Sequence, residues 1–386
     1  MHGNGRKPIF QFIFMSISKD FSFRNLLAPA AFVYGAVVRV RNLLFNSGVF
    51  SSRQYPIPVI SVGNLTVGGT GKTPHVEWLV RQITSAGYRV AVLSRGYKRV
   101  TKGYVRADRG RSSLSLGDES WQIWSKFPNV IVVVDEDRRH GIEQLLALPE
   151  EERPQVILLD DAFQHRWVKP SFSILLTDAR RLFYQDKLLP MGRLREPAQG
   201  VSRSDIIIVT KCDRNLRPIE ARIMRDDIKI WAFQEVFFSY IAYSPLSAVF
   251  ADAINEPIAS FANISKDTQV VVMTGIVNHE PLMEHLETML ELNSSDQIIG
   301  FHFADHHAYS SSDFERVDKH FRSLPADKRI IITTEKDAAR LIACEDILPE
   351  AWRSVLYTIP IEIEFCFGEQ EQFRQKIMNH IETFQK

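Results

Sequence analysis

The chain has 386 residues, 45% hydrophobic and 24% charged, so it can bury a substantial core and is long enough for two domains. Its formal net charge of +1 argues against the basic field of a dedicated nucleic-acid binder, so any anion must be bound locally. Three cysteines without a C-x-x-C pair (Cys212, Cys344 and Cys366) argue against a disulfide framework or a thiolate zinc site and favour a reducing compartment.

The N-terminal segment, residues 1–50, contains two uncharged apolar stretches, Ile9–Ile17 and Leu26–Val38, and the second is followed by Arg39 and Arg41. Both are shorter than the roughly 18–20 residues that a membrane-spanning helix needs. The late apolar run and the lack of a small-residue cleavage site argue against a signal peptide. Two alternatives remain at this point: a helix that lies on a bilayer with its arginines near lipid phosphates, or a buried core helix.

Beyond residue 50, short apolar runs alternate with segments of helical periodicity. The first run, Val59–Val62, ends in a glycine-rich loop, and apolar positions at helical spacing follow over His75–Ser85. Further strands are expected at Val90–Leu93, Val130–Val134, Val156–Leu159, Ser173–Leu176 and Ile206–Val209. This alternation predicts an α/β fold with a mostly parallel sheet and helices on both faces.

The pattern changes near residue 233. Two extended segments, at about 233–245 and 356–366, are expected to pair as a β-strand linker. Between them the alternation of helices and strands returns, with strands at Val270–Met273, Ile298–Phe303 and Arg329–Ile332. We therefore expect a core over residues 51–232 and a second, smaller α/β domain over residues 233–386, which includes the linker strands and a C-terminal helix.

A glycine-rich loop lies between the first strand and the first helix of the core, which is the context of a P-loop. Its residues are Thr66, Val67, Gly68, Gly69, Thr70, Gly71, Lys72 and Thr73. The glycines let backbone N–H groups surround a phosphate, Lys72 is expected to reach the β and γ oxygens of ATP, and the Thr73 hydroxyl can ligate Mg²⁺. Thr66 replaces the usual first glycine, so the loop is a variant that should still bind ATP.

The run Val156–Leu159 ends in two carboxylates, as a Walker B strand does. Asp160 occupies the position of the aspartate that associates with Mg²⁺, and Asp161 is a second acid beside the phosphates. Together the two motifs predict a P-loop NTPase-like core.

One further motif favours a different nucleotide. Thr210–Asp213 reads T-K-C-D, which fits the [NT]-K-x-D pattern by which GTPases recognise guanine. A membrane-associated P-loop GTPase or ATPase is therefore the alternative to a kinase. The D-x-x-G switch of GTPases is missing, because Ala162 and Phe163 follow the two aspartates.

Several segments, taken in chain order, resemble the tetraacyldisaccharide 4′-kinase family. They are Ser61–Pro74, Ser94–Tyr97, Gly117–Glu119, Asp160–Arg166, Leu189–Pro197, Asp305–His307 and Thr334–Asp337. The resemblance implies an enzyme that uses ATP and Mg²⁺ to phosphorylate the 4′-hydroxyl of a tetraacyldisaccharide 1-phosphate. The product would be lipid IVA, an intermediate of lipid A and lipopolysaccharide biosynthesis.

The resemblance also implies catalytic roles. The aspartate of the family's G-D-E segment, here Asp118, is the general base, and a histidine of the second domain orients it. His306 is the best match, and His307 remains open. From the sequence alone, a helix N-cap is the favoured interpretation of Asp118, and the family resemblance reverses that preference. Asp161 is the third residue expected to act in catalysis.

The remaining expected site residues bind the metal or the acceptor. The candidate Mg²⁺ ligands are Thr73, Asp160 and Glu119, and the candidates for the sugar and its 1-phosphate are Arg95, Arg138, Arg195 and Glu196. Arginine suits this task because its guanidinium makes forked contacts with phosphate. Ala162 departs from the family, which usually has glycine there, and we expect activity to survive.

A lipid acceptor stays in the bilayer, so the resemblance favours membrane docking of the N-terminal segment over a buried core helix. It implies a peripheral or monotopic protein on the cytoplasmic face of the inner membrane of a Gram-negative bacterium. Neither a nucleic acid nor a protein partner is expected.

Overall fold

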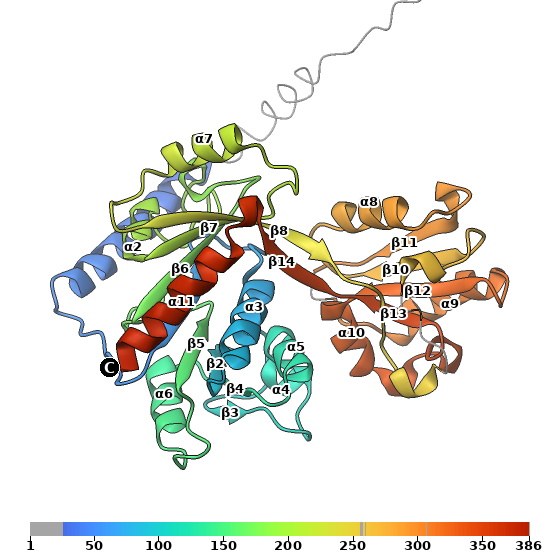
Figure 1. The fold of residues 1–386 in the computed structure, drawn as a ribbon, viewed down its shortest axis with the longest axis horizontal. Helices are drawn as coiled ribbons and strands as arrows, with labels where there is room; N and C mark the ends of the chain where they lie inside the picture. The colour runs from blue at the N-terminus through green and yellow to red at the C-terminus, as the bar shows by residue number, and fades with distance from the viewer. Residues whose placement is uncertain (1–25, 255–257, 259, 306, 386) are drawn as a thin grey trace, which may run out of the picture.

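The computed structural model describes residues 26–254, 258, 260–305 and 307–385, so that the apolar stretch Ile9–Ile17 and His306 lie outside the described residues. Two sheets with helices against both faces lie side by side, and a pair of strands runs between them (Figure 1). The expected α/β class, with a mostly parallel sheet, a smaller second sheet and a strand linker, is confirmed.

In the part of the chain that the structure describes, the larger sheet has nine strands in the order β14-β8-β7-β6-β1-β5-β2-β4-β3. All neighbours from β8 to β4 are parallel, and the edge strands β14 and β3 are antiparallel. The strands are β1 (Val59–Asn64), β2 (Val90–Ser94), β3 (Val105–Arg106), β4 (Ile131–Val134), β5 (Val156–Asp160), β6 (Phe172–Asp178), β7 (Ile206–Thr210), β8 (Glu235–Tyr243) and β14 (Ile361–Phe365). The central strands form continuous apolar runs because both faces of the sheet are covered.

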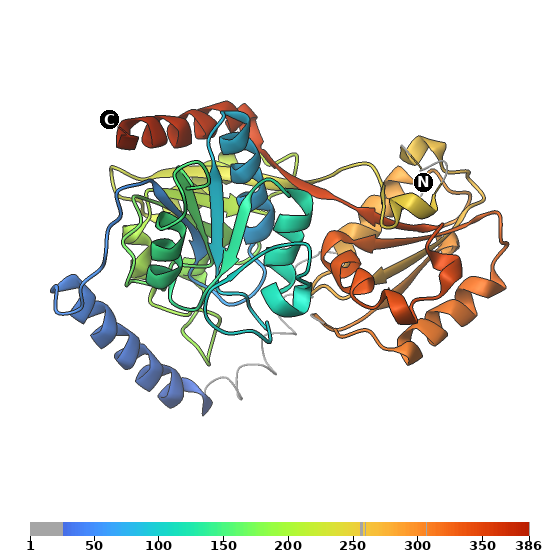
Figure 2. The same ribbon diagram turned by 90° about the horizontal axis from the view of Figure 1, so that it is seen from below.

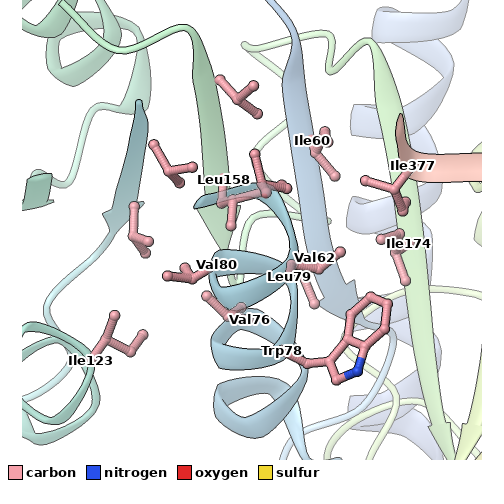
Figure 3. Packing of buried hydrophobic residues seen from close by; sticks show 14 of the residues in the cluster. Ile60, Val62, Val76, Trp78, Leu79, Val80, Ile123, Leu158, Ile174 and Ile377 are labelled. Atoms are coloured by element: carbon pink, nitrogen blue, oxygen red, sulfur yellow. The ribbon is translucent and has the colours of Figure 1, made fainter. Parts of the chain in front are cut away.

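Side chains alternate between the two faces of this sheet. Ile60 and Val62 of β1 point to the face that carries α3, where they pack with Val76 and Leu79 (Figure 3). Val59 lies in the cluster on the opposite face. The first face carries α3 (Lys72–Ser85), α4 (Ser113–Leu116), α5 (Asp118–Lys126) and α11 (Gln370–Gln385), and the opposite face carries α6 (Arg138–Leu146) and α7 (Pro218–Ile228).

The smaller sheet has the order β11-β10-β12-β13-β9, and only the edge strand β9 is antiparallel among the described residues. Its strands are β9 (Ser247–Ala248), β10 (Gln269–Thr274), β11 (Ile298–His302), β12 (Arg329–Thr334) and β13 (Leu356–Ile359). Helix α8 (Glu280–Met289) packs on one face, and α9 (Ser311–Ser323) and α10 (Glu335–Ile342) pack on the other.

The second extended segment is divided at Pro360. The sequence predicts one strand over about 356–366, whereas the structure has β13 in the smaller sheet and β14 in the larger sheet. Proline has no N–H for a ladder and fixes its own φ, so it suits the crossing between two sheets. Only β14 pairs with β8, from Ile361↔Tyr243 to Phe365↔Ser239. Helix α11, which follows, packs on the larger sheet, so β8, β14 and α11 all belong to its layers.

Helix α2 (Ala28–Asn46) lies along the surface of the core, as Figure 2 shows in dark blue. Its buried positions, Ala31, Gly35, Val38 and Phe45, recur at helical spacing and face the core. Large apolar side chains on the rest of the helix and at its ends remain exposed: Leu26, Phe32, Val33, Val37, Val40, Leu43 and Val49. The helix is therefore not buried in the core. No helix among the described residues is long and apolar enough to cross a membrane.

Candidate active site

The phosphate loop connects the carboxyl end of β1 to the first turn of α3. Gly68 and Gly71 have φ of +108° and +81°, a backbone region that favours glycine, and Gly71 is the N-cap residue of α3. Asn64 fixes the loop from inside, because its Nδ2 donates to Thr70 Oγ1 at 2.8 Å. These contacts leave Lys72 and Thr73 in the first turn of the helix, where the expected nucleotide contacts require them.

The end of β7 supports the same loop. Thr210 Oγ1 donates to the carbonyl oxygen of Thr70 at 2.9 Å, and Lys211 Nζ donates to the carbonyl oxygen of Gly69 and lies 2.9 Å from Asp178. The carboxylate of Asp213 accepts the Asn215 N–H at 2.7 Å, which closes a local turn. The T-K-C-D motif thus holds the phosphate loop in place, a contact that the sequence alone did not predict.

The segment that carries Arg195 lies against the start of the loop. Thr66 forms a β-bridge with Leu194, and Arg195 N donates to the carbonyl oxygen of Leu65 at 2.7 Å. Arg195 Nη1 lies 2.9 Å from both carboxylate oxygens of Asp161, and Lys72 Nζ lies 3.6 Å from Asp161 Oδ1. The structure therefore brings Lys72, Asp161 and Arg195 together, although they come from three separate motifs.

Asp160 is the last residue of β5 and is buried, with 2% of its surface exposed. Burial, together with the nearby charges of Glu119 and Asp161, raises the pKa of this carboxyl to about 7. Its Oδ1 atom is buried and has no hydrogen-bond partner within the described structure. An orphaned buried carboxylate oxygen is the kind of atom that a bound cation satisfies.

The pKa of Asp161 is shifted in the opposite direction from that of Asp160. Burial alone would raise its pKa, but the Lys72 ammonium and the Arg195 guanidinium hold the pKa of Asp161 below its ordinary value. Its φ is +47°, so the left-handed position after the strand is residue 161. Ala162 is not in that backbone region, which explains how alanine is accommodated where the family usually has glycine.

Arg138 begins α6 and is also buried, with 3% of its surface exposed. Burial lowers the pKa of this guanidinium to about 10, while the carboxylates of Asp161 and Asp160 act in the opposite direction. Arg95 lies just beyond β2, is exposed, and is close enough to lower the Arg138 pKa further. Arg138 therefore lies beside the two aspartates, and Arg95 lies near Arg138. The carboxyl ends of β1, β2, β4 and β5 meet at one edge because these strands are parallel.

Asp118 is the first residue of α5, and Gly117 is the N-cap, so the N-cap alternative for Asp118 is wrong. Gly117 has a φ of +84°, and a Cβ at this position would lie 2.8 Å from the carbonyl oxygen of Tyr97. The Asp118 Oδ2 atom accepts a hydrogen bond from Arg340 Nε of α10 at 2.9 Å, and Arg340 Nη2 forms an ion pair with the same oxygen at 2.8 Å. Nothing in the sequence pointed to Arg340, which is 222 residues away.

Only one of the two histidine candidates, His307, is among the residues that the structure describes. His306 lies outside the described residues. His307 Nε2 is 2.9 Å from the carboxylate of Asp313, and the imidazole stacks on Phe303 with ring centroids 4.9 Å apart. No contact between His307 and Asp118 is among the described interactions of His307.

Glu196 joins the site to helix α2. Its carboxylate is 1% exposed and accepts hydrogen bonds from Arg203 at 2.8 Å, Gln164 at 3.1 Å and Asn42 of α2 at 3.2 Å. Tyr34 of α2 donates to the carbonyl oxygen of Arg195 at 2.6 Å. Helix α2 is therefore hydrogen-bonded to the segment that carries Arg195, and Arg195 in turn contacts Asp161.

A Mg²⁺ ion fits the site only as part of a complex with nucleotide phosphate. Among the residues that the structure describes, no three His, Cys, Asp or Glu side chains are grouped so as to hold a metal ion unaided. The candidate ligands are two carboxylates, Asp160 and Glu119, and the Thr73 hydroxyl. This donor set suits Mg²⁺, which is usually bound by one or two carboxylates while water and substrate phosphates complete its shell.

Comparison with known proteins identifies the family. A model of the tetraacyldisaccharide-1-P 4′-kinase family matches residues 23–382. The chain belongs to this family. Among the family's curated members, the tetraacyldisaccharide 4′-kinase of Parabacteroides distasonis is 47% identical over 94% of this chain and 95% of its own length. The same-named protein of Bacteroides thetaiotaomicron is 44% identical over 92% of both chains.

A solved structure of the family agrees with the fold. The crystal structure described as the "apo" form of LpxK from Aquifex aeolicus in complex with ATP is 27% identical, with a TM-score of 0.71. The match covers 93% of this chain and 99% of that chain. The family resemblance inferred from the motifs is confirmed, and the GTPase alternative is not favoured.

Proposed function

We propose that this protein is a tetraacyldisaccharide 4′-kinase that transfers the γ-phosphate of ATP to the 4′-hydroxyl of tetraacyldisaccharide 1-phosphate. The product is lipid IVA, so the reaction is a step of lipid A biosynthesis. The observation that carries the proposal is the convergence of Lys72, Asp161 and Arg195 at the phosphate loop of a chain that belongs to this family. A kinase needs such a cluster of charges, because phosphoryl transfer depends mainly on positioning and charge neutralisation.

The phosphate loop binds ATP. Backbone N–H groups of Gly68 to Thr73 surround the β-phosphate, and Lys72 leaves Asp161 to contact the β and γ oxygens. Thr73, Asp160 and Glu119 would hold Mg²⁺, which supplies neutralisation of phosphate charge when bound. The raised pKa and the orphaned oxygen of Asp160 support this assignment, because the first reflects burial close to two other carboxylates and the second an oxygen that no hydrogen bond satisfies.

Asp118 acts as the general base. It accepts the proton of the 4′-hydroxyl while that oxygen bonds to the γ-phosphorus, and the bond between the γ-phosphorus and its bridging oxygen to the β-phosphate breaks, so that ADP leaves. A histidine of the second domain, His306 or His307, orients the base. Asp161 organises Lys72 and Arg195 around the transferred group.

The 1-phosphate and sugar of the acceptor are bound by Arg95, Arg138 and Arg195. The exposure of Arg95 near Arg138 supports this role, since its guanidinium is accessible to a lipid headgroup. Glu196 supports the acceptor site by fixing α2 beside Arg195.

The exposed apolar face of α2 docks on the membrane surface that contains the acceptor. Val33, Val37 and Val40 recur at helical spacing and together with Phe32 form a surface that suits the acyl boundary of a bilayer. Arg39 is exposed next to this face and would meet lipid phosphates. The docking is peripheral or monotopic, at the cytoplasmic face of the inner membrane, where ATP is available.

We also propose that the chain works as three parts. Residues 1–50 associate with the membrane, residues 51–232 together with β8, β14 and α11 form the kinase core, and the smaller sheet with its helices forms the second α/β domain, which the β8–β14 linker connects to the core. Closure of the second domain over the core would exclude water from the γ-phosphate.

The decisive experiment measures phosphate transfer. Purified full-length protein in detergent micelles is incubated with γ-labelled ATP, Mg²⁺ and tetraacyldisaccharide 1-phosphate, beside Lys72→Ala and Asp118→Ala variants. Label is expected on the lipid with the wild type and not with either variant. Hydrolysis of GTP without lipid labelling would contradict the proposal.

A further inference from the structure

The Thr334–Asp337 segment has no part in the mechanism above, yet the structure gives it an ordered setting. Thr334 ends β12 and is the N-cap residue of α10, and its Oγ1 accepts the Asp337 N–H at 3.2 Å. The same hydroxyl donates to the Asp337 carboxylate at 2.7 Å. The segment therefore fixes a carboxylate inside the second domain.

Asp337 is fully buried, with 0% of its surface exposed, and its carboxylate accepts further hydrogen bonds. Oδ2 accepts the Gly275 N–H at 2.9 Å, and Oδ1 accepts from the Tyr309 hydroxyl at 3.1 Å. Arg340 Nη1 lies 2.9 Å from Oδ1. A carboxylate with this many hydrogen-bond donors and one adjacent cation is held in a single orientation.

Arg340 extends from this carboxylate to the larger sheet. Its side chain is 8% exposed, its Nε donates to Asp118 Oδ2 at 2.9 Å, and its Nη2 lies 2.8 Å from the same oxygen. One guanidinium thus joins a buried carboxylate of the second domain to the aspartate at the start of α5. The planar fork of arginine makes both contacts at once, whereas a lysine ammonium could not reproduce this geometry.

Arg340 is not the only attachment of α10 to α5. Lys126, at the end of α5, lies 2.8 Å from Glu335, at the start of α10. The helices are therefore joined at both ends, and the Lys126 contact does not involve Asp118. Docking of the second domain does not depend on Arg340 alone, so its contact with Asp118 has a separate consequence for that carboxylate.

We infer that Arg340, fixed by Asp337, is a positioning residue that orients the Asp118 carboxylate for proton acceptance from the acceptor hydroxyl. The inference rests on the proposed role of Asp118 as general base. It assigns the Thr334–Asp337 motif the task of fixing Arg340. It also makes the orientation of the base depend on the presence of the second domain against α5.

The test uses full-length protein and compares kcat with KM at saturating and limiting ATP and lipid. Arg340→Gln is expected to lower kcat by about 10²-fold with both KM values within about threefold, because the contact matters at the transition state. The kcat of Arg340→Lys is expected to lie between those of the wild type and of Arg340→Gln, since lysine restores the charge without the planar guanidinium. Arg322→Gln, which removes an exposed arginine of the same domain on α9, is the matched control and is expected to leave kcat unchanged.

Asp337→Asn supplies a second variant that leaves Arg340 in place. Asp337→Asn is also expected to lower kcat. The kcat of the Asp337→Asn/Arg340→Gln double variant is expected to be no lower than that of Arg340→Gln. Thermal unfolding identifies any variant that fails to fold. If Arg340→Gln fails to fold, kcat and KM are compared between Arg340→Lys and the wild type instead.

Three results would overturn the inference: unchanged kcat in Arg340→Gln, a higher kcat, or a rise in both KM values that accounts for the whole loss. A wild type that does not label the lipid refutes the proposed function instead, so that the two failures are distinct.

Discussion

Lys126 of α5 lies 2.8 Å from Glu335 of α10 and 2.7 Å from Glu77 of α3. Its ammonium therefore forms ion pairs with one helix of the larger sheet and one helix of the smaller sheet. Glu335 also accepts the Ile361 N–H at 3.2 Å, at the start of β14. This residue therefore contacts both a helix of the core and a strand of the linker. Desolvation acts to lower the Lys126 pKa, but Glu77 and Glu335 outweigh it and raise that pKa.

Replacement of Lys126 tests the strength of this junction. Lys126→Met leaves Glu77, which is 3% exposed, without its cation and is expected to lower the free energy of unfolding by about 1–3 kcal/mol. The measurement is thermal or urea unfolding at pH 8. Lys266→Met is the control, because its pair with Glu291 is exposed and is expected to contribute about 0–0.5 kcal/mol. Equal losses in the two variants would contradict the expectation.

The two aspartates at the end of β5 are expected to affect stability with opposite signs in protein free of metal and nucleotide. Asp160 keeps its proton up to about pH 7 in the folded state, whereas in the unfolded chain its ordinary pKa is 3.8. Its burial therefore makes the free energy of unfolding fall as the pH rises from about 4 to 7. Asp160→Asn is expected to raise that free energy at pH 8 by about 1–3 kcal/mol and to change it little near pH 4.

Asp161→Asn is the matched comparison. The pKa of Asp161 is lowered in the folded state, so its charge contributes stability above the ordinary value of 3.8, and this is lost as the pH falls through the lowered pKa. The variant is expected to unfold at a lower temperature than the wild type at pH 8. Melting curves from pH 4 to 8 in EDTA test both variants, and shifts of the same sign at pH 8 would contradict the assignment.

Gly117 is expected to control the placement of Asp118. Gly117→Ala puts a methyl group 2.8 Å from the Tyr97 carbonyl oxygen at a φ of +84°, so the start of α5 must shift. We expect kcat for lipid phosphorylation to fall by about 10-fold or more, because a small misplacement of a catalytic group is costly. Gly103→Ala is the control, since Gly103 has a φ of +68° but open space around it. Its kcat should match that of the wild type.

Membrane docking through α2 predicts a loss of binding on charge insertion. Val37→Glu and Leu43→Glu replace exposed side chains, 63% and 64% exposed, and are each expected to weaken binding to anionic vesicles about 10-fold. Vesicle co-sedimentation measures the effect. Ile219→Glu changes an apolar residue on α7 that is 56% exposed and should leave binding unchanged. If all three variants bind like the wild type, α2 is not the docking surface.

Local chemistry let the sequence predict the nucleotide half of the site. The glycines, Lys72 and Thr73 lie within one strand-loop-helix unit, and Asp160 ends an apolar strand, so both positions follow from backbone geometry and side-chain alternation. The central strands of both sheets are predicted for the same reason, since buried parallel strands form short continuous apolar runs, whereas the short edge strands β3 and β9 are not. Motifs likewise marked Asp118, with a histidine rather than Arg340 as its expected partner.

The tertiary structure alone decided what joins distant segments. Arg340 meets Asp118 from 222 residues away, and Lys211 reaches Gly69 from 142 residues away. The division of the last extended segment at Pro360 depends on which sheet each of its halves pairs with, and α11 packs on the larger sheet through contacts with distant segments. Helix α2 shows the same limit: its composition fits a core or a membrane surface, and only its packing reveals an exposed apolar face. The sequence fixes what each segment prefers locally, whereas these contacts depend on where the whole chain brings segments together.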